Sequence, residues 1–154
     1  VSLQCLRVLH HSSSTPFLGN SFSLERVDDG MRVNDFQLTK NFNLREFACK
    51  HCGAVKVHPK LVRLLQELRD VLGKPLWFTS AYRCPEHNAR VGGARNSRHL
   101  TGEAVDIPVY ITGLSYAALF ELVKELGFTG IGVNKTKGFI HVDVREGDLV
   151  VFEY

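Results

Sequence analysis

Three short apolar segments follow one another at the end of the chain, and they constrain the possible folds more than any other feature. Each has the β-branched and alternating apolar residues of a strand, and only a few residues separate it from the next. The segments are 129–134, 138–144 and 149–154. Strands that neighbour one another late in the chain, after helical segments, are typical of an α+β domain. We therefore predict an α+β fold in which a small antiparallel sheet packs against helices.

Helical and strand patterns precede these segments. Leucines recur three and four positions apart in residues 59–72, so they fall on one face of a helix that would contribute to the core. Further predictions are a strand at 76–83, a short helix at 85–91, a strand at 102–109 and an amphipathic helix at 114–127. These helices supply the second layer against which the sheet can bury one face.

The chain divides into an arm and a domain. Residues 1–30 are rich in turn-forming residues and lack sustained periodicity, which predicts an irregular N-terminal arm. Residues 31–154 are sufficient for one core, and the hydrophobic content of 44% is that of a globular protein. No apolar stretch approaches the ~20 residues that a membrane span needs. Arg7 interrupts the apolar part of the arm, so we do not expect a signal peptide.

The charge of the chain limits its choice of partner. A formal net charge of +3 is too small to indicate a dedicated nucleic-acid-binding protein. It still favours an anionic polymer over a cationic one. We expect a monomer that binds no nucleic acid.

Polar side chains interrupt the apolar pattern of two predicted strands. Asp106 lies between Val105 and Ile107, so on a strand its side chain points to the opposite face from theirs. A carboxylate among apolar neighbours needs a partner, because burying it unpaired costs several kcal/mol. His141 and Asp143 share one face of the other strand by the same alternation. These side chains therefore mark a candidate site.

His99, Asp106 and His141 form a set that could hold zinc. Zinc binds imidazole and carboxylate groups, and a hydrolytic site needs three protein ligands with one position open for water. His99 and Asp106 are seven positions apart, but a turn at Gly102 can bring them together. Spacing alone equally allows a loop histidine, an acid in a salt bridge and a satisfied core histidine.

The most specific motif is Ser97-x-His99-x-x-Gly102-x-Ala104-x-Asp106, preceded by the tetrapeptide SAYR at 80–83 and followed by His141. This pattern closely resembles the zinc D-Ala-D-Ala carboxypeptidase family. That family includes the D-Ala-D-Ala dipeptidases of vancomycin resistance and shares its fold with the Hedgehog signalling domain. The resemblance extends over residues 36–154, and the run 84–107 is most similar to the short phage and prophage members.

The resemblance implies a zinc metallopeptidase that hydrolyses peptidoglycan stem peptides, of the D-Ala-D-Ala carboxypeptidase or D,D-endopeptidase type. Within the family, the residues that match His99, Asp106 and His141 bind zinc. The match to Arg83 engages the substrate carboxylate or steadies the transition state, and the match to Ser97 helps to hold the peptide. A phage endolysin of this type would stay in the cytoplasm until lysis releases it to the cell wall. An exported member would act in the periplasm or outside the cell.

The chain departs from the family at the general base. Many relatives carry Glu, Asp or His three residues before the last zinc histidine, where this chain has Gly138. Asp143 is the best substitute, because it shares the strand face of His141, and it acts either as a catalytic base or only as an orienting group. Without a base, the same fold would be a non-catalytic, zinc-containing module that binds the cell wall or a protein.

Cysteines and a histidine form a second candidate metal site. Cys49-x-x-Cys52 and Cys84-x-x-His87 are two pairs with the spacing of structural zinc sites. If the pairs meet, a closed site would attach the loop around Cys49 to the start of the following helix, beside Arg83. Otherwise Cys49 and Cys52 are free thiols, or a disulfide in an exported protein, and His87 is a surface residue.

Overall fold

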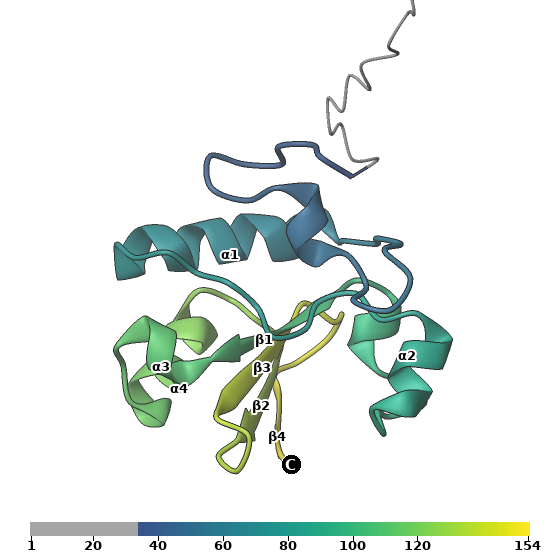
Figure 1. The fold of residues 1–154 in the computed structure, drawn as a ribbon. Coiled ribbons are helices and arrows are strands. Elements are labelled where there is room, and N and C mark those ends of the chain that lie inside the picture. The colour runs from purple at the N-terminus through teal and green to yellow at the C-terminus, as the bar shows by residue number, and fades with distance from the viewer. Residues whose placement is uncertain (1–33) are drawn as a thin grey trace, which may run out of the picture. The chain divides into compact units, whose positions relative to one another are not determined.

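A four-stranded sheet lies at the centre of the fold, with helices above it and on both sides (Figure 1). The computed structural model describes residues 34–154, and the arm predicted over 1–30 lies outside these residues. In chain order the elements are η1 (Leu44–Phe47), α1 (Pro59–Leu72), α2 (Pro85–Arg90), η2 (Arg98–Leu100), β1 (Ala104–Pro108), α3 (Val109–Thr112), α4 (Tyr116–Glu125), β2 (Gly130–Asn134), β3 (Phe139–Asp143) and β4 (Val150–Glu153). None of the helices within 34–154 combines the length and the apolar character needed to cross a bilayer.

The sheet has the strand order β1-β3-β2-β4, and the predicted α+β class is confirmed. β3 pairs antiparallel with both β1 and β2, as expected. The sheet is mixed rather than wholly antiparallel, because β4 runs parallel to β2. The chain reverses after β3 and then passes β2 to reach the outer edge, so β4 runs in the same direction as β2. Consecutive strands are therefore not always neighbours in this sheet.

Helix α1 has the bounds that the leucine spacing predicts, Pro59–Leu72. The side chain of His58 caps its first turn by accepting a backbone N–H. The leucines of α1 belong to the same buried core as Ile140 and Val142 of β3. Because side chains alternate along a strand, burying these two residues in the core turns His141 to the opposite face.

Residues 76–83 do not form the predicted strand. They make a single bridge to β1, at Ser80 and Asp106, and then leave the sheet. Beyond the bridge, the backbone N–H of Arg83 donates to the carbonyl oxygen of His99 at 3.0 Å. A strand needs a continuous ladder of bonds to one neighbour, whereas this segment divides its bonds among different partners. The consequence for the site is that Arg83 lies next to His99.

Candidate metal centre

The three side chains predicted as zinc ligands lie together in the structure. β1 carries Asp106, β3 carries His141 and the short helix η2 carries His99, and all three side chains are buried. His99 Nε2 lies 3.2 Å from Asp106 Oδ1 and 3.2 Å from His141 Nδ1, and the latter two atoms are 3.0 Å apart. Gly102 makes the turn between η2 and β1 with a φ of 76°, packed against the backbone of Lys56.

The spacing of these atoms suits one small metal ion. Zinc binds nitrogen and oxygen ligands at ~2.0–2.2 Å, so ligand atoms at the corners of a tetrahedron around it lie ~3.3–3.6 Å apart. The three atoms here are separated by 3.0 to 3.2 Å, only a little less than this distance. They therefore have the arrangement of one face of a zinc tetrahedron.

Hydrogen-bond partners on the far side of each imidazole aim its lone pair at this point. His99 Nδ1 donates to the carbonyl oxygen of Ala81 at 2.7 Å, which leaves the lone pair of the neutral ring on Nε2. His141 Nε2 faces Asp143 Oδ2 at 3.1 Å, which leaves its lone pair on Nδ1. Two nitrogen lone pairs and the Asp106 carboxylate therefore converge, and a cation is the partner that satisfies all three.

The electrostatics of the three groups also favour a cation. Burial raises the pKa of Asp106, but its contacts with His141 and His99 outweigh burial and hold this pKa well below its usual range. Burial lowers the pKa of His99. Burial also acts to lower the pKa of His141, but its contacts with Asp106 and Asp143 outweigh that effect and raise the pKa. The site thus contains a buried negative charge that a metal ion, or a proton on His141, can balance.

Arg83 holds the second oxygen of the Asp106 carboxylate. Its Nη2 donates to Asp106 Oδ2 at 2.5 Å, and its Nε donates to Ser80 Oγ at 2.7 Å. Within residues 34–154, no hydrogen bond engages the third nitrogen, Nη1. The family resemblance implied a substrate contact for Arg83, whereas its contact with a candidate metal ligand emerges only from the structure.

Asp143 lies behind His141 and is fully buried. Arg145 binds it through Nε at 2.8 Å, through the backbone N–H at 3.1 Å and through Nη2. Burial raises the pKa of Asp143, but Arg145 and His141 outweigh burial and lower this pKa below its usual range. Gly130 lies opposite on β2 and leaves room for the carboxylate, since a Cβ there would be 2.2 Å from it. Asp143 therefore faces Nε2 of His141, whereas Nδ1 of the same ring points at the other two candidate ligands.

A cleft of about 340 Å³ opens at His141, one of the three candidate ligands. Its walls include His141 and Ser97, the residue predicted to hold the peptide. The other lining residues are Arg83, Gly92, Gly93, Ala94, Asn96, Arg98, Arg145, Phe152 and Tyr154. No Asp or Glu is among these described residues, so Asp143 does not face the cleft. A larger cavity of about 610 Å³ is lined by none of the three candidate ligands.

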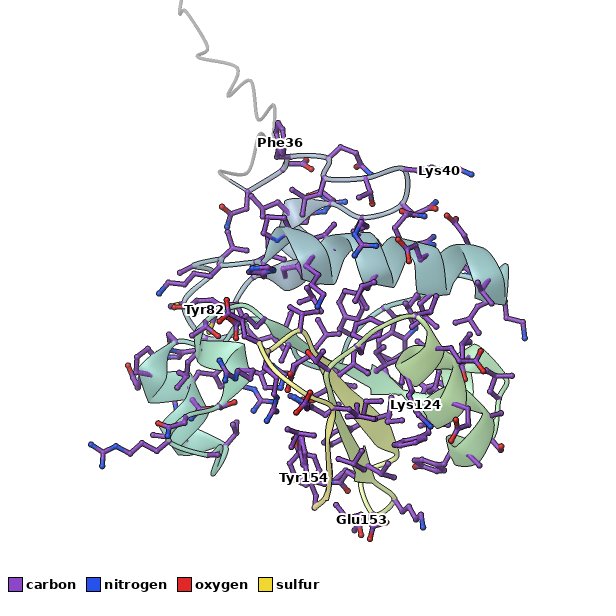
Figure 2. All side chains as sticks on the ribbon, turned by 180° about the vertical axis from the view of Figure 1, so that it is seen from behind. Phe36, Lys40, Tyr82, Lys124, Glu153 and Tyr154 are labelled. Atoms are coloured by element: carbon purple, nitrogen blue, oxygen red, sulfur yellow. The ribbon has the colours of Figure 1, made fainter. Side chains whose placement is uncertain are left out.

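Three residues of this cleft were not indicated by any sequence motif: Arg145, Phe152 and Tyr154. Alternation is the signal that could have found them, because Arg145 lies two positions beyond Asp143, and Tyr154 lies two positions beyond Phe152. The His141 ring centroid lies 5.5 Å from that of Phe152 and 6.4 Å from that of Tyr154. Tyr154 directly follows β4 (Figure 2). Burial and the nearby carboxylates raise the pKa of Tyr154 to about 12, so its hydroxyl remains a donor at neutral pH.

Gly138, at the position where many relatives have a base, lies in the turn between β2 and β3. Its φ is 74°, and its N–H closes the turn by donating to Asn134 O at 3.0 Å. No described atom lies within 4 Å of the place where a Cβ would be. The backbone of this turn therefore favours glycine, and the described chain has no proton acceptor at this position.

The second predicted cluster is also assembled. Cys49, Cys52 and Cys84 place their sulfur atoms within 4.8 Å of one another. His87, the fourth predicted member, places Nδ1 3.3 Å from the Cys49 sulfur. Burial raises the pKa of the Cys49 thiol, but the backbone N–H groups of Cys84, Cys52 and His51 outweigh burial and lower this pKa to about 6.

Comparison with known proteins agrees with the first site. The family model described as Peptidase M15 matches residues 37–143, a range that includes all three candidate ligands. The zinc D-Ala-D-Ala carboxypeptidase of Streptomyces albus G is 38% identical to this chain over 68 residues. The match covers 44% of this chain and 26% of that protein, so the chain spans about a quarter of that relative's length.

Proposed function

This chain belongs to the peptidase M15 family, and we propose that it is a zinc-dependent peptidase that hydrolyses peptidoglycan stem peptides. The observation that carries the proposal is the convergence of His99 Nε2, Asp106 Oδ1 and His141 Nδ1 within 3.2 Å of one another. The relative from Streptomyces albus G supports the metal and the substrate class, because its name specifies zinc and D-Ala-D-Ala. The activity would be that of a D-Ala-D-Ala carboxypeptidase or a D,D-endopeptidase.

His99, Asp106 and His141 would hold the zinc ion. When bound, zinc supplies a Lewis acid that polarises the scissile carbonyl group and lowers the pKa of water to ~7. The protein keeps the three donor atoms in place beforehand. The paired strands β1 and β3 fix two of them, and the bond to the Ala81 carbonyl fixes the third. Rigid elements of this kind hold a site more accurately than loops do.

Arg83 is proposed to support the metal site and to bind the substrate. Its bonds to Asp106 and Ser80 hold the guanidinium group at the wall of the cleft. Nη1 is then available to donate a hydrogen bond to a substrate carboxylate, or to the carbonyl oxygen that becomes negative when the peptide bond is attacked. A carboxypeptidase substrate ends in a free carboxylate, which this cation fits. Ser97, on the same cleft wall, is proposed to hold the peptide next to it.

Asp143 is proposed to orient His141 rather than to accept the proton in the reaction. Its lowered pKa and its bonds to Arg145 keep it ionised, so it holds the proton of His141 on Nε2. A carboxylate in this position fixes the tautomer and the ring orientation of a metal-binding histidine. Arg145 forms an ion pair with Asp143 and balances its buried charge.

A second candidate function is a zinc-containing module that binds the cell wall without cleaving it. The observation that favours it is the absence of a base: Gly138 has no side chain, and no Asp or Glu lines the described part of the cleft. A positioned general base contributes ~10²–10⁴-fold to a rate. A protein without one would therefore bind stem peptides but turn them over slowly or not at all.

Mass spectrometry of products from purified muropeptides tests the proposal. The zinc-loaded protein should release D-Ala or cleave a cross-link, and both a chelator and His99→Ala should abolish the product. Sedimentation with isolated cell walls, measured in parallel, separates the two candidates. Pelleting with the walls without any product would replace the peptidase with the binding module, and neither pelleting nor product would reject both.

A further inference from the structure

A second cluster of metal-binding side chains joins the loop after η1 to the start of α2, two segments that lie side by side in Figure 1. Cys49 and Cys52 are on the loop, Cys84 caps the first turn of α2, and His87 lies within that turn. The three sulfur atoms lie within 4.8 Å of one another, and His87 Nδ1 is 3.3 Å from the Cys49 sulfur. None of these residues lines the cleft described above.

Backbone N–H groups point at the sulfur atoms. The N–H of Cys84 donates to the Cys49 sulfur at 3.4 Å, and the N–H of His87 donates to the Cys84 sulfur at 3.4 Å. Gly53 allows the tight turn after Cys52 with a φ of 72°, and its N–H donates to the Cys49 carbonyl at 2.8 Å. Amide donors around sulfur stabilise the thiolate, which is the form that binds metals.

We propose that Cys49, Cys52, Cys84 and His87 bind a second zinc ion with a structural role. Three thiolates and one imidazole are a common ligand set of closed tetrahedral zinc sites. With Zn–S bonds of ~2.3 Å, the sulfur atoms of such a site lie ~3.8 Å apart, a spacing that the upper bound of 4.8 Å on the three observed sulfur distances allows. A disulfide would use two of the three sulfur atoms and leave the third, together with His87, without a role.

The choice of His87 over His51 as the fourth ligand follows from their surroundings. His51 also approaches the cluster, with Nδ1 3.4 Å from the Cys84 sulfur. Its other nitrogen, however, lies 3.5 Å from Glu86 and 3.3 Å from Arg90 at the exposed surface. His87 is held by the helix and faces the buried sulfur of Cys49. His51 is therefore assigned to a supporting position outside the ligand set.

The second zinc ion would brace the first site. Cys84 directly follows Arg83, whose side chain holds Asp106 and whose backbone N–H donates to the carbonyl oxygen of His99. Fixing Cys84 to the loop at Cys49 therefore fixes the backbone from which Arg83 extends. This inference rests on the cysteine cluster alone, and it holds whether or not the chain is a peptidase.

Zinc content measured by elemental analysis tests the proposal. Wild-type protein should contain two equivalents, while Cys52→Ser and His99→Ala should each contain one. Cys52 is exposed, so its substitution should leave the fold intact by circular dichroism while lowering the melting temperature. Cys5→Ser is the matched control, at a cysteine outside the described residues, and should keep two equivalents. Two equivalents retained in Cys52→Ser, or never more than one in the wild type, would overturn the proposal.

Cobalt substitution separates this proposal from the proposed function. In His99→Ala, cobalt(II) should still give the strong thiolate-to-metal charge-transfer absorption, because the cysteine cluster supplies the thiolates within residues 34–154. Cys52→Ser should lose that absorption even if it still cleaves muropeptides. His87→Ala should weaken cobalt binding at least tenfold more than His51→Ala does, and the reverse order would transfer the fourth ligand to His51. If His99→Ala shows no sulfur-to-cobalt absorption, the second site does not exist, whatever the peptidase assay shows.

Discussion

Asp106 and His141 lie directly opposite each other across β1 and β3, with Asp106 Oδ1 3.0 Å from His141 Nδ1. The same register places Ala104 opposite Asp143, so His141 and the Asp143 carboxylate behind it each have a fixed neighbour on β1. Side chains on paired strands cannot shift independently, because the ladder of backbone bonds sets their spacing. The sheet therefore provides a rigid support for two of the three candidate ligands.

Loss of His99 should remove the metal from the first site. His99→Ala deletes one of three donor atoms and leaves Asp106 and His141, which are too few for a stable zinc site. We expect the variant to lose about one equivalent of zinc by elemental analysis and to form no product from muropeptides. His58→Asn is the control, because it keeps a side chain that can cap α1 and lies outside the site. Full zinc content in His99→Ala would contradict the ligand assignment.

Arg83→Lys should impair activity without releasing zinc. A lysine cannot reproduce the bonds to Ser80 and Asp106 together, because it presents a single nitrogen. Hydrogen bonds to charged groups contribute ~1.5–3 kcal/mol, so kcat/KM should fall roughly 10–100-fold. Arg63→Lys, in an exposed pair with Glu67, is the matched control and should behave as the wild type. Near-normal kcat/KM in Arg83→Lys would show that the guanidinium group is dispensable.

Asp143→Asn distinguishes an orienting group from a base. An orienting carboxylate behind a metal-binding histidine affects metal affinity or activity ~10–100-fold, and we expect a loss in this range. The exposed Asp148 provides the control, since Asp148→Asn should change neither zinc affinity nor rate. A rate loss beyond ~10³-fold with zinc retained would instead identify Asp143 as the base.

The stability contribution of Asp143 should depend on pH. Its pKa is lowered in the folded protein by Arg145 and His141 against the effect of burial, so the folded state favours the ionised form. This contribution is complete above the unfolded pKa of ~3.9 and is lost as the pH falls towards the folded value. Asp143→Asn should therefore be less stable than the wild type at neutral pH, and the difference should narrow below about pH 4.

Urea unfolding in the presence of a chelator measures this effect, because the chelator removes the competition between protons and metal. The free energies of unfolding are compared from about pH 7 down to about pH 3. A difference between wild type and Asp143→Asn that is the same at every pH would show that the charge of Asp143 contributes nothing to folding.

Gly130→Ala should disturb Asp143 from the neighbouring strand. A Cβ at this position would be 2.2 Å from the Asp143 carboxylate, which Arg145 holds in place. Overpacking of this kind costs ~1–3 kcal/mol, and zinc affinity should fall as it does in Asp143→Asn. In an Asp143→Ala background the same substitution should cost much less, because the carboxylate that it meets is gone. Equal costs in the two backgrounds would rule out this contact as the cause.

Local properties of the chain were predicted well from the sequence. The bounds of α1 follow from leucine spacing with Pro59 and Gly73 at its ends, and the pattern needs no information from elsewhere in the chain. The strands β1 and β3 likewise follow from alternation, which also predicts that Asp106 and His141 leave the apolar face. Residue type and spacing made His99, Asp106 and His141 a possible metal site, and the resemblance of the motif at 97–106 to a zinc peptidase family singled them out.

Only the tertiary structure decided which distant groups meet. Residues 76–83 have the composition of a strand, but their backbone bonds go to several partners, and β4 pairs with β2 because the chain passes over it to the free edge. The contacts of Arg83 with Asp106 and of Arg145 with Asp143 likewise depend on how the loops pack. Propensity and periodicity act over a few residues, whereas strand order and ion pairs are set by packing between segments far apart in sequence. The sequence by itself thus determined most of the elements and the candidate ligands, and the packing determined the strand order and the partners that orient those ligands.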